Sequence, residues 1–454
     1  MFFAKYKDQY RQNLMLALPV MLTQLGQMTT QVADNLMVGN YGGTDPVPLA
    51  AVSFGGSVSF IFFITSIAVA FGLTPLVGEL YVRGEHKRSA ELLHNGILFY
   101  VLIGIVSAIG QYAIIPLMSH MGQPEEVVAM AIPYYKMLLV SMPFVMLFFA
   151  FKQFLEGVGN TKVEMVVTII ANTVNIALNW VLIFGRMGFD EMGATGAGLS
   201  TLISRILASI LIVGWFASRP VYRPYLSGFS LRRWSWTTIR KLIRMGMPIS
   251  AQAFTESSAF VGTSLMMGWL GTEALSANHI AITVSNCSFM IVMAIGAATT
   301  IRVSHCYGMR DITQMSRAIK ASYHLVLLWN AMAAIAFISL RFVIPALFTQ
   351  NAEVIAITAS LLVYAAMYQL SDGLQHVSVG TLRGLQDVKI IMPIAVMAYW
   401  VLNLPVGYVL AFHCGMGPDG LFAGYIVGLS VAAALMIARI RRKIREMRVA
   451  GNAA

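Results

Sequence analysis

Long apolar stretches, separated by short polar segments, recur along the whole chain. No charged residue occurs from Asn95 to Ser119 or from Leu421 to Ala438. A helix needs about 20 such residues to cross the hydrocarbon of a bilayer, so by length the chain contains about twelve candidate spans. Their approximate cores are residues 13–37, 48–80, 94–118, 129–151, 163–184, 194–217, 246–269, 274–301, 321–340, 354–381, 390–412 and 420–438.

The composition agrees with this pattern. Of the 454 residues, 57% are hydrophobic and only 11% are charged, whereas a soluble domain carries about 25% charged residues. A soluble protein of this composition would expose too much apolar surface to stay dispersed. We therefore expect an all-α polytopic membrane protein. The basic residues that precede the first apolar stretch lead into a run too long for a signal peptide, and we interpret it as the first membrane helix.

The distribution of basic residues predicts the orientation. With the N-terminus in the cytoplasm and the spans alternating, all but four of the 31 Lys and Arg lie on the cytoplasmic side. Arg186 and Arg341 lie outside, and Lys136 and Arg205 lie within spans, with roles that the sequence does not reveal. This bias follows the positive-inside rule and predicts a multi-pass protein of the bacterial inner membrane with both termini in the cytoplasm. The basic C-terminal run lacks interleaved aromatic residues, so we expect it to meet anionic lipid and not nucleic acid.

The chain consists of two similar halves. The octapeptide LEGVGNTK at 155–162 returns as LRGLQDVK at 382–389, and MGATG at 192–196 returns as MGPDG at 416–420. Parallel repeats with an even number of spans are related by an axis along the membrane normal, and two such bundles can open a central cavity to either side in turn. We predict an N-lobe at 1–218 (helices 1–6), a cytoplasmic linker at 219–238, a C-lobe at 239–440 (helices 7–12) and a basic cytoplasmic tail at 441–454.

Carboxylates occur within the predicted spans, where they are costly and usually functional. Asp372 lies well inside the tenth span, four residues after Tyr368 and hence on the same helical face. Glu256 lies near the middle of the seventh. These oxygen atoms could surround Na⁺, which takes oxygen ligands, or share protons; alternatively, the two carboxyls are unrelated and locally hydrogen-bonded. Glu79 and Glu156 fall near span ends, where we expect pairing with Arg83 and Lys152.

The first half has a polar set of its own. Asp34 lies in the first span, and Asn175 and Asn179 share one face of the fifth. Asparagine amides both donate and accept, which suits a proton, cation or substrate site; the alternative is hydrogen bonding between helices as packing. His279 and His376 are secondary candidates for substrate contact.

Signals for catalysis are absent from the sequence. It has no G-x-x-x-x-G-K-[ST], H-E-x-x-H or G-x-S-x-G motif, and its three cysteines have no C-x-x-C spacing. We expect no enzyme, no catalytic residue and no cofactor, and an ion gradient as the source of energy. The 29 Met and 25 Phe suit a cavity for varied organic cations, although ordinary membrane packing is the better explanation for any single one of them.

Several motifs together resemble one family of transporters. The chain is similar to multidrug and toxic-compound extrusion (MATE) transporters of the bacterial NorM type. The motifs are LALPVMLTQ, VADNLMVG, LEGVGNTK, NIALNW, MGATGAGLST, FTESSAF and YQLSDGLQHVSVGTLRG, in that order from residue 16 to residue 384.

The resemblance implies a V-shaped pair of six-helix lobes that exports cationic drugs in exchange for Na⁺ or H⁺. It implies a C-lobe cation site at Glu256, Tyr368 and Asp372, and an N-lobe site for protonation or drug release at Asp34, Asn175 and Asn179. We expect a monomer among membrane lipids. A flippase for a lipid-linked precursor, which has a related architecture, is the alternative, but it should carry more basic residues in its cavity.

Overall fold

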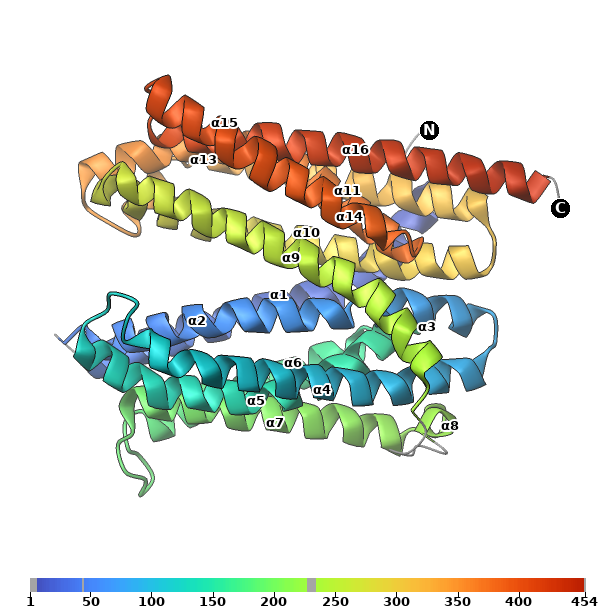
Figure 1. Ribbon diagram of the computed structural model, residues 1–454, viewed down its shortest axis with the longest axis horizontal. Coiled ribbons are helices and arrows are strands. Elements are labelled where there is room, and N and C mark those ends of the chain that lie inside the picture. The colour runs from blue at the N-terminus through green and yellow to red at the C-terminus, as the bar shows by residue number, and fades with distance from the viewer. Residues whose placement is uncertain (1–5, 43–44, 227–233, 453–454) are drawn as a thin grey trace. The chain divides into compact units, whose positions relative to one another are not determined.

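The computed structural model describes residues 6–42, 45–226 and 234–452, and every regular element in these ranges is a helix (Figure 1). All the expected spans are helical. Part of the expected linker (227–233), the first five residues and residues 43–44 of the expected N-lobe, and the last two residues of the expected tail lie outside the described residues. In the first half, the helices are α1 (Lys7–Gly42), α2 (Val47–Ala70), α3 (Leu73–Val82), α4 (His86–Met118), α5 (Glu125–Gly157), α6 (Lys162–Leu182), α7 (Gly193–Ser218) and α8 (Arg223–Leu226).

The second half continues with similarly long helices. They are α9 (Trp236–Trp269), α10 (Thr272–Gly308), α11 (Ile312–Ser339), α12 (Val343–Ala346), α13 (Ala352–Gly384), α14 (Ile391–Ala395), α15 (Leu404–Tyr408) and α16 (Pro418–Asn452). Three short elements accompany them: η2 (Val388–Ile390) is a 3₁₀ turn, and η3 (Val396–Asn403) and η4 (Val409–His413) are π-helical.

Ten helical segments of the described chain are long and apolar enough to cross a membrane, which identifies a multi-pass membrane protein. Two long helices, α1 and α9, are not among the ten. Both carry a run of polar residues, TQLGQMTTQVADN in α1 and AQAFTESS in α9. These runs include the candidate carboxylates Asp34 and Glu256. Helices this polar are tolerated in a bilayer only where the polar face meets protein or water.

The chain forms two compact units, and the helices α1 and α9 are each divided between them. The N-unit comprises residues 22–250 and the C-unit comprises residues 6–21 and 251–452. Each division falls two residues after a proline within the helix, Pro19 in α1 and Pro248 in α9. The first part of each repeat's first helix therefore packs in the unit formed mainly by the other repeat.

In the C-unit, the first part of α1 is held by buried polar groups. Arg302 on α10 donates through Nη1 to Asn13 Oδ1 at 2.8 Å and through Nη2 to Gln9 Oε1 at 2.7 Å. Asn13 in turn donates to Ser322 Oγ on α11 at 2.8 Å. Asn13, Gln9 and Arg302 are all buried, so three helices share one closed hydrogen-bond network.

In the N-unit, the first part of α9 packs through Ile239 and Leu242, which are buried in the apolar core, and through close backbone contacts. Ser250 Oγ donates to the carbonyl of Thr65 on α2 at 2.8 Å. Gly246 lies against the carbonyl of Val69, so closely that a Cβ atom would clash with it. Only glycine permits this approach.

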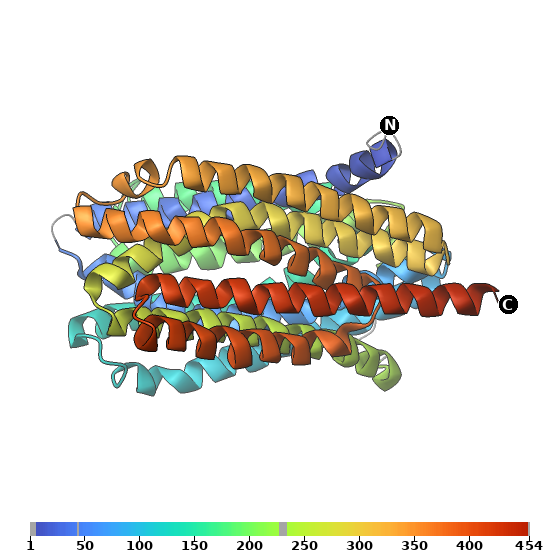
Figure 2. The same ribbon diagram turned by 90° about the horizontal axis from the view of Figure 1, so that it is seen from above.

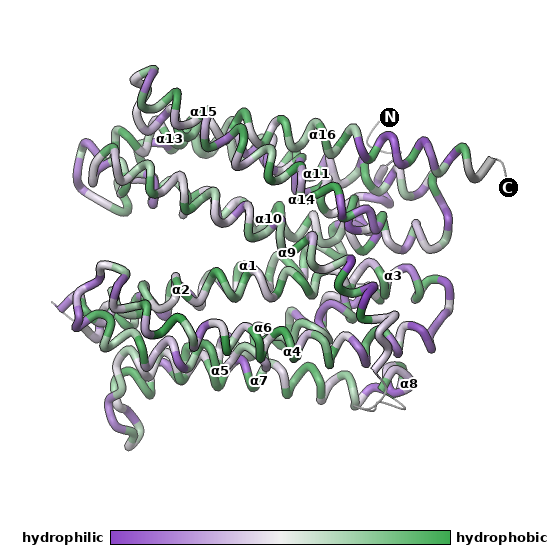
Figure 3. The backbone as a smooth tube through the Cα atoms, in the orientation of Figure 1, coloured by the Kyte–Doolittle hydropathy of each residue, from purple (hydrophilic) through white to green (hydrophobic). Residues whose placement is uncertain are grey.

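Each unit is built around one central helix. In the N-unit, α5 packs against α2, α4 and α7; in the C-unit, α13 packs against α10, α11 and α16 (Figure 2). Figure 3 shows apolar residues along the middles of these helices, with hydrophilic residues gathered at the turn between α3 and α4 and in the last part of α16.

The repeated octapeptide forms the same helix end in both units. Gly157, which ends α5, leaves no room for a Cβ beside Val77, and Gly384, which ends α13, leaves none beside Val303. Just beyond, the N–H of Asn160 donates to the carbonyl of Leu155 at 2.8 Å, and the equivalent N–H of Asp387 donates to Leu382 at 2.9 Å. These are helix C-cap hydrogen bonds of the Schellman kind. The shared glycine is therefore required by close packing of a second helix.

Candidate functional site

The N-unit brings its three candidate polar residues together. The Asn179 amide on α6 donates to Asp34 Oδ1 on α1. With its amide nitrogen toward Asp34, Asn175 also donates to Oδ1 at 2.9 Å, and its oxygen accepts from the Thr201 N–H on α7 at 3.3 Å. The half-buried carboxylate thus receives two amide donors from one face of α6. A carboxylate held in this way keeps its second oxygen for a proton, a cation or a substrate.

A basic residue approaches the same region of the N-unit. Arg205 on α7 donates through Nη1 to Ser141 Oγ at 2.7 Å, and its guanidinium lies 5.2 Å from the centre of the Phe63 ring. It lies one turn after Thr201, whose N–H donates to Asn175. Arg205 is therefore held by side chains of the bundle.

In the C-unit, Glu256 on α9 is the centre of a second polar group. Its Oε1 accepts from the Tyr399 hydroxyl at 3.0 Å, and its Oε2 accepts from the Gln252 amide at 3.3 Å. The Tyr399 hydroxyl is also 3.2 Å from Gln375 Oε1 on α13. Arg383 Nη2 donates to Gln252 Oε1 at 3.2 Å, which places a guanidinium next to this group.

Asp372 lies beside this group on α13. It is buried about one turn before Gln375, whose Oε1 is 3.2 Å from the Tyr399 hydroxyl. Among the described residues, no side-chain hydrogen bond to Asp372 is found. Tyr368 is buried one turn earlier, with its ring against Phe422 and Tyr425. No hydrogen bond joins Tyr368 to Glu256 among the described residues, and the tyrosine that donates to Glu256 is Tyr399.

Tyr399, Gln252 and Gln375 were not among the sequence candidates. Tyr399 lies in η3, and π-helical segments are frequent at functional sites. One feature of the sequence that indicates an irregular helix here is Pro405, six residues after Tyr399. A proline lacks an N–H for the preceding turn and disturbs the helical register. Arg383 was expected in a cytoplasmic segment, but it lies in the last turn of α13 beside Gln252.

Neither secondary histidine candidate is hydrogen-bonded to the two polar groups in the described residues. His279 is exposed on α10, where its carbonyl accepts from Thr283. His376 is half-buried with its ring edge-on to Phe289, 4.7 Å between centroids. Neither ring has a hydrogen bond to Glu256 or Asp372 among the described residues.

Two other carboxylates pair with basic residues, as predicted. Glu79 Oε1 lies 2.7 Å from Arg83, and Glu156 Oε1 lies 3.8 Å from Lys152. The sequence did not indicate the third member of the second pair. Glu164 on α6 is completely buried, and its Oε2 lies 3.5 Å from the same Lys152 Nζ.

Both polar groups offer oxygen donors suited to a small hard cation. The C-unit group presents carboxylate, phenol and amide oxygens, which are the ligand types that alkali and alkaline-earth cations take. Within the described residues there is no cluster of three or more His, Cys, Asp or Glu side chains that could hold a metal ion.

Comparison with known proteins gives consistent results. A sequence profile of the MatE family matches the chain twice, over residues 19–181 and again over 248–409, which reproduces the internal repeat. The chain is 32% identical over 441 residues to "Multidrug resistance protein NorM" of Photobacterium profundum, covering 96% of each chain. It is 31% identical over 442 residues to "Probable multidrug resistance protein NorM" of Mannheimia succiniciproducens, covering 96% of this chain and 94% of that protein.

Solved structures share the fold at lower sequence identity. One is the outward-facing conformation of a multidrug resistance MATE family transporter of the MOP superfamily. It superposes with a TM-score of 0.87 over 97% of both chains at 19% identity. A second is a MATE structure in the bent conformation, with a TM-score of 0.85 at 19% identity, covering 98% of this chain and 97% of that one.

Proposed function

We propose, because the chain belongs to the MatE family, that it is a multidrug efflux transporter of the NorM type. In the proposed reaction it exports organic cations across the bacterial inner membrane and exchanges them for Na⁺ or H⁺. Both chain ends would be cytoplasmic, and the protein would act as a monomer. The named relatives support multidrug export, and the geometry of the polar groups supports the exchange.

The observation that carries the exchange is the Glu256 group. Asp372 is buried and Glu256 is half-buried in a helical unit, and among the described residues the cation next to their group is Arg383, which donates to Gln252. Burying a carboxylate without a counter-charge is costly. A mobile cation that neutralises the second carboxyl removes this cost. Ion binding therefore stabilises the conformation in which Glu256 and Asp372 surround the ion.

The N-unit group would act on the substrate or on a proton. In the described residues the amide donors reach only Oδ1 of Asp34, so Oδ2 can bind a proton or accept from a substrate. Coupling requires that ion and drug favour different conformations, because a ligand shifts an equilibrium only by its differential affinity for the two states. We assign the coupling ion to the C-unit group and drug release to the Asp34 group.

Purified protein in proteoliposomes tests the proposal. Transport of a fluorescent organic cation should require an imposed gradient of Na⁺ or of protons, with each gradient applied separately. Asp372→Asn, Glu256→Gln and Asp34→Asn should each abolish most gradient-driven transport, whereas Asp190→Asn, at an exposed loop position, should not. Transport that persists at the wild-type rate in the Glu256 and Asp372 variants, or with every ion gradient collapsed, would refute ion exchange. Movement of a lipid-linked precursor in place of the organic cation would support the flippase.

A further inference from the structure

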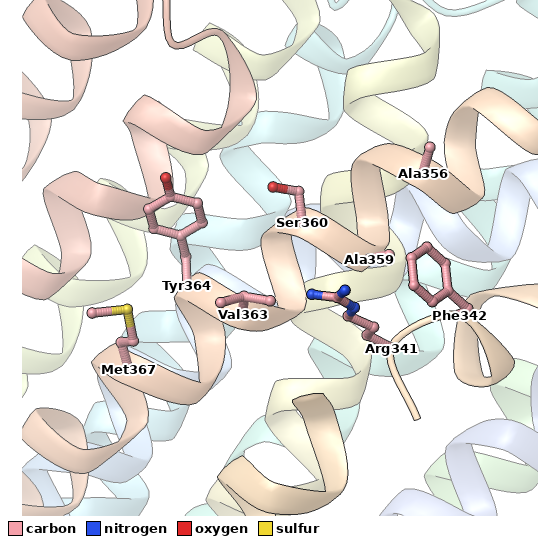
Figure 4. A pocket seen from close by; sticks show the side chains of 8 residues that line it. All are labelled: Arg341, Phe342, Ala356, Ala359, Ser360, Val363, Tyr364 and Met367. Atoms are coloured by element: carbon pink, nitrogen blue, oxygen red, sulfur yellow. The ribbon is translucent and has the colours of Figure 1, made fainter. Parts of the chain in front are cut away.

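A pocket of about 730 Å³ lies on the C-unit along the first half of α13 (Figure 4). The proposed topology places this half toward the outer side of the membrane. The side chains that matter here come from α13 and from the segment between α11 and α12: Arg341, Phe342, Ala356, Ser360, Tyr364 and Met367.

The pocket changes from polar to apolar along the helix axis. Phe342 and Ala356 lie at its outer end, Arg341 and Ser360 follow about one turn further along, and Met367, which is 52% exposed, lies at the other end. From Ser360, at the level of the charged groups, to Met367 the helix rises about 10 Å. One leaflet of a bilayer contributes about 15 Å of hydrocarbon. The pocket therefore follows the same order, headgroup region and then acyl region, as a phospholipid standing beside the helix.

The outer part of the pocket carries two opposite charges. The Arg341 guanidinium lies 4.9 Å from the centre of the Phe342 ring and has no carboxylate within ion-pair distance in the described chain. Figure 4 shows it reaching toward the turn of α13 that contains Ser360 and Val363. Ser360 Oγ, in turn, donates to Asp419 Oδ2 in the first turn of α16 at 2.8 Å. The carboxylate of Asp419 is only half-buried, so an anion lies beside the pocket and a cation inside it.

We propose that this pocket binds one molecule of phosphatidylethanolamine from the outer leaflet. The Arg341 guanidinium binds the phosphate, for which its planar fork is suited. The ammonium group donates to the Asp419 carboxylate, and one acyl chain lies along Tyr364 and Met367. This zwitterionic headgroup matches both charges. Phosphatidylglycerol has no cation for Asp419, and the quaternary ammonium of phosphatidylcholine has no N–H to donate.

The lipid pocket and the proposed cation group both use α13, but they use different faces of this helix. Met367 points outward, whereas its neighbour Tyr368 is buried and precedes Asp372 on the inner face. A bound lipid would brace the outer half of α13. Its binding does not depend on the proposed transport function.

Native mass spectrometry of the full-length protein, with each of the three phospholipids added in turn, tests the assignment. Phosphatidylethanolamine should be retained about tenfold more tightly than the other two, the effect of one charge-assisted hydrogen bond. Arg341→Ala and Asp419→Asn should each remove this preference. Asparagine keeps an acceptor for Ser360, so the second variant should fold. Arg186→Ala and Asp190→Asn, exposed positions of the N-unit on the same proposed side, should leave it intact.

A third variant tests the pocket without changing charge. Ala356 is exposed at the outer end, so Ala356→Trp should fill the pocket and displace the lipid while the fold is kept. Equal retention of phosphatidylcholine would overturn the ammonium contact, and tighter binding of phosphatidylglycerol would overturn the zwitterionic assignment. Unchanged retention in both Arg341→Ala and Ala356→Trp would overturn the site itself.

Discussion

The hydroxyl of Tyr399 lies between two acceptors, 3.0 Å from Glu256 Oε1 and 3.2 Å from Gln375 Oε1. A phenol has a single proton, so it can donate to only one of the two at a time. Tyr399 therefore keeps the Glu256 carboxylate in position while leaving it free to exchange partners. This behaviour suits a carboxylate that must bind and release an ion.

Removing this hydroxyl should weaken ion binding without unfolding the protein. A hydrogen bond to a charged group contributes about 1.5–3 kcal/mol, so Tyr399→Phe should raise the ion concentration for half-maximal transport by roughly tenfold or more. The measurement is transport in proteoliposomes as a function of Na⁺ and of pH. Tyr408→Phe, a few turns along the same helical segment with its side chain 40% exposed, is the control. An unchanged ion dependence in Tyr399→Phe would show that the hydroxyl has no part in positioning Glu256.

The sequence predicted the helices and the repeat well, because both depend on local patterns. Apolar length located the spans, including the more polar α1 and α9, which fall below the apolar threshold that the other ten meet. The four-residue spacing of Asn175 and Asn179 predicted that both lie on one face of their helix, and in the structure this face meets Asp34. Tyr399 could not be found in this way. It is 143 residues from Glu256, and only the packing of η3 against α9 joins them. The sequence also could not predict that α1 is divided between the two units after Pro19. Periodicity shows which face of a helix is apolar, but it does not show which bundle that face meets.

The glycines of the repeated octapeptide provide a test of the internal repeat. In Gly157→Ala the new methyl group would lie 2.8 Å from Val77 Cβ, and in Gly384→Ala it would lie 2.7 Å from Val303 Cβ. Overpacking of this kind costs about 1–3 kcal/mol. Both variants should therefore lower the thermal unfolding temperature of the purified protein by similar amounts. Gly214→Ala, which has open space around its Cβ, should be neutral or stabilising; a loss as large as in the other two would contradict the steric explanation.

The network of Arg302 should make Asn13 important for stability. Asn13→Leu removes the acceptor for a buried guanidinium and the donor to Ser322, while it keeps the helix and the side-chain volume. Leaving a buried charged donor with fewer partners costs about 1–3 kcal/mol. Thermal unfolding should show this loss, and proteolysis should cut first in the part of α1 before Pro19. Gln12→Leu, at the adjacent exposed position, is the control, and equal stability of both variants would mean that the network does not hold α1.

The buried group of Lys152, Glu156 and Glu164 gives the largest expected loss. Lys152 Nζ is within 3.8 Å of both carboxylates, and in the described structure the oxygens of Glu164 have no hydrogen-bond donor. Lys152→Met would leave two carboxyls buried without a cation, at a cost of about 3–5 kcal/mol. Lys162→Met, an exposed lysine at the start of α6, should change little. If charge is the cause, adding Glu164→Leu to Lys152→Met should recover part of the stability, because replacing both partners of a buried pair by apolar groups is often neutral. A double variant less stable than Lys152→Met alone would instead assign Glu164 a structural role of its own, independent of the lysine.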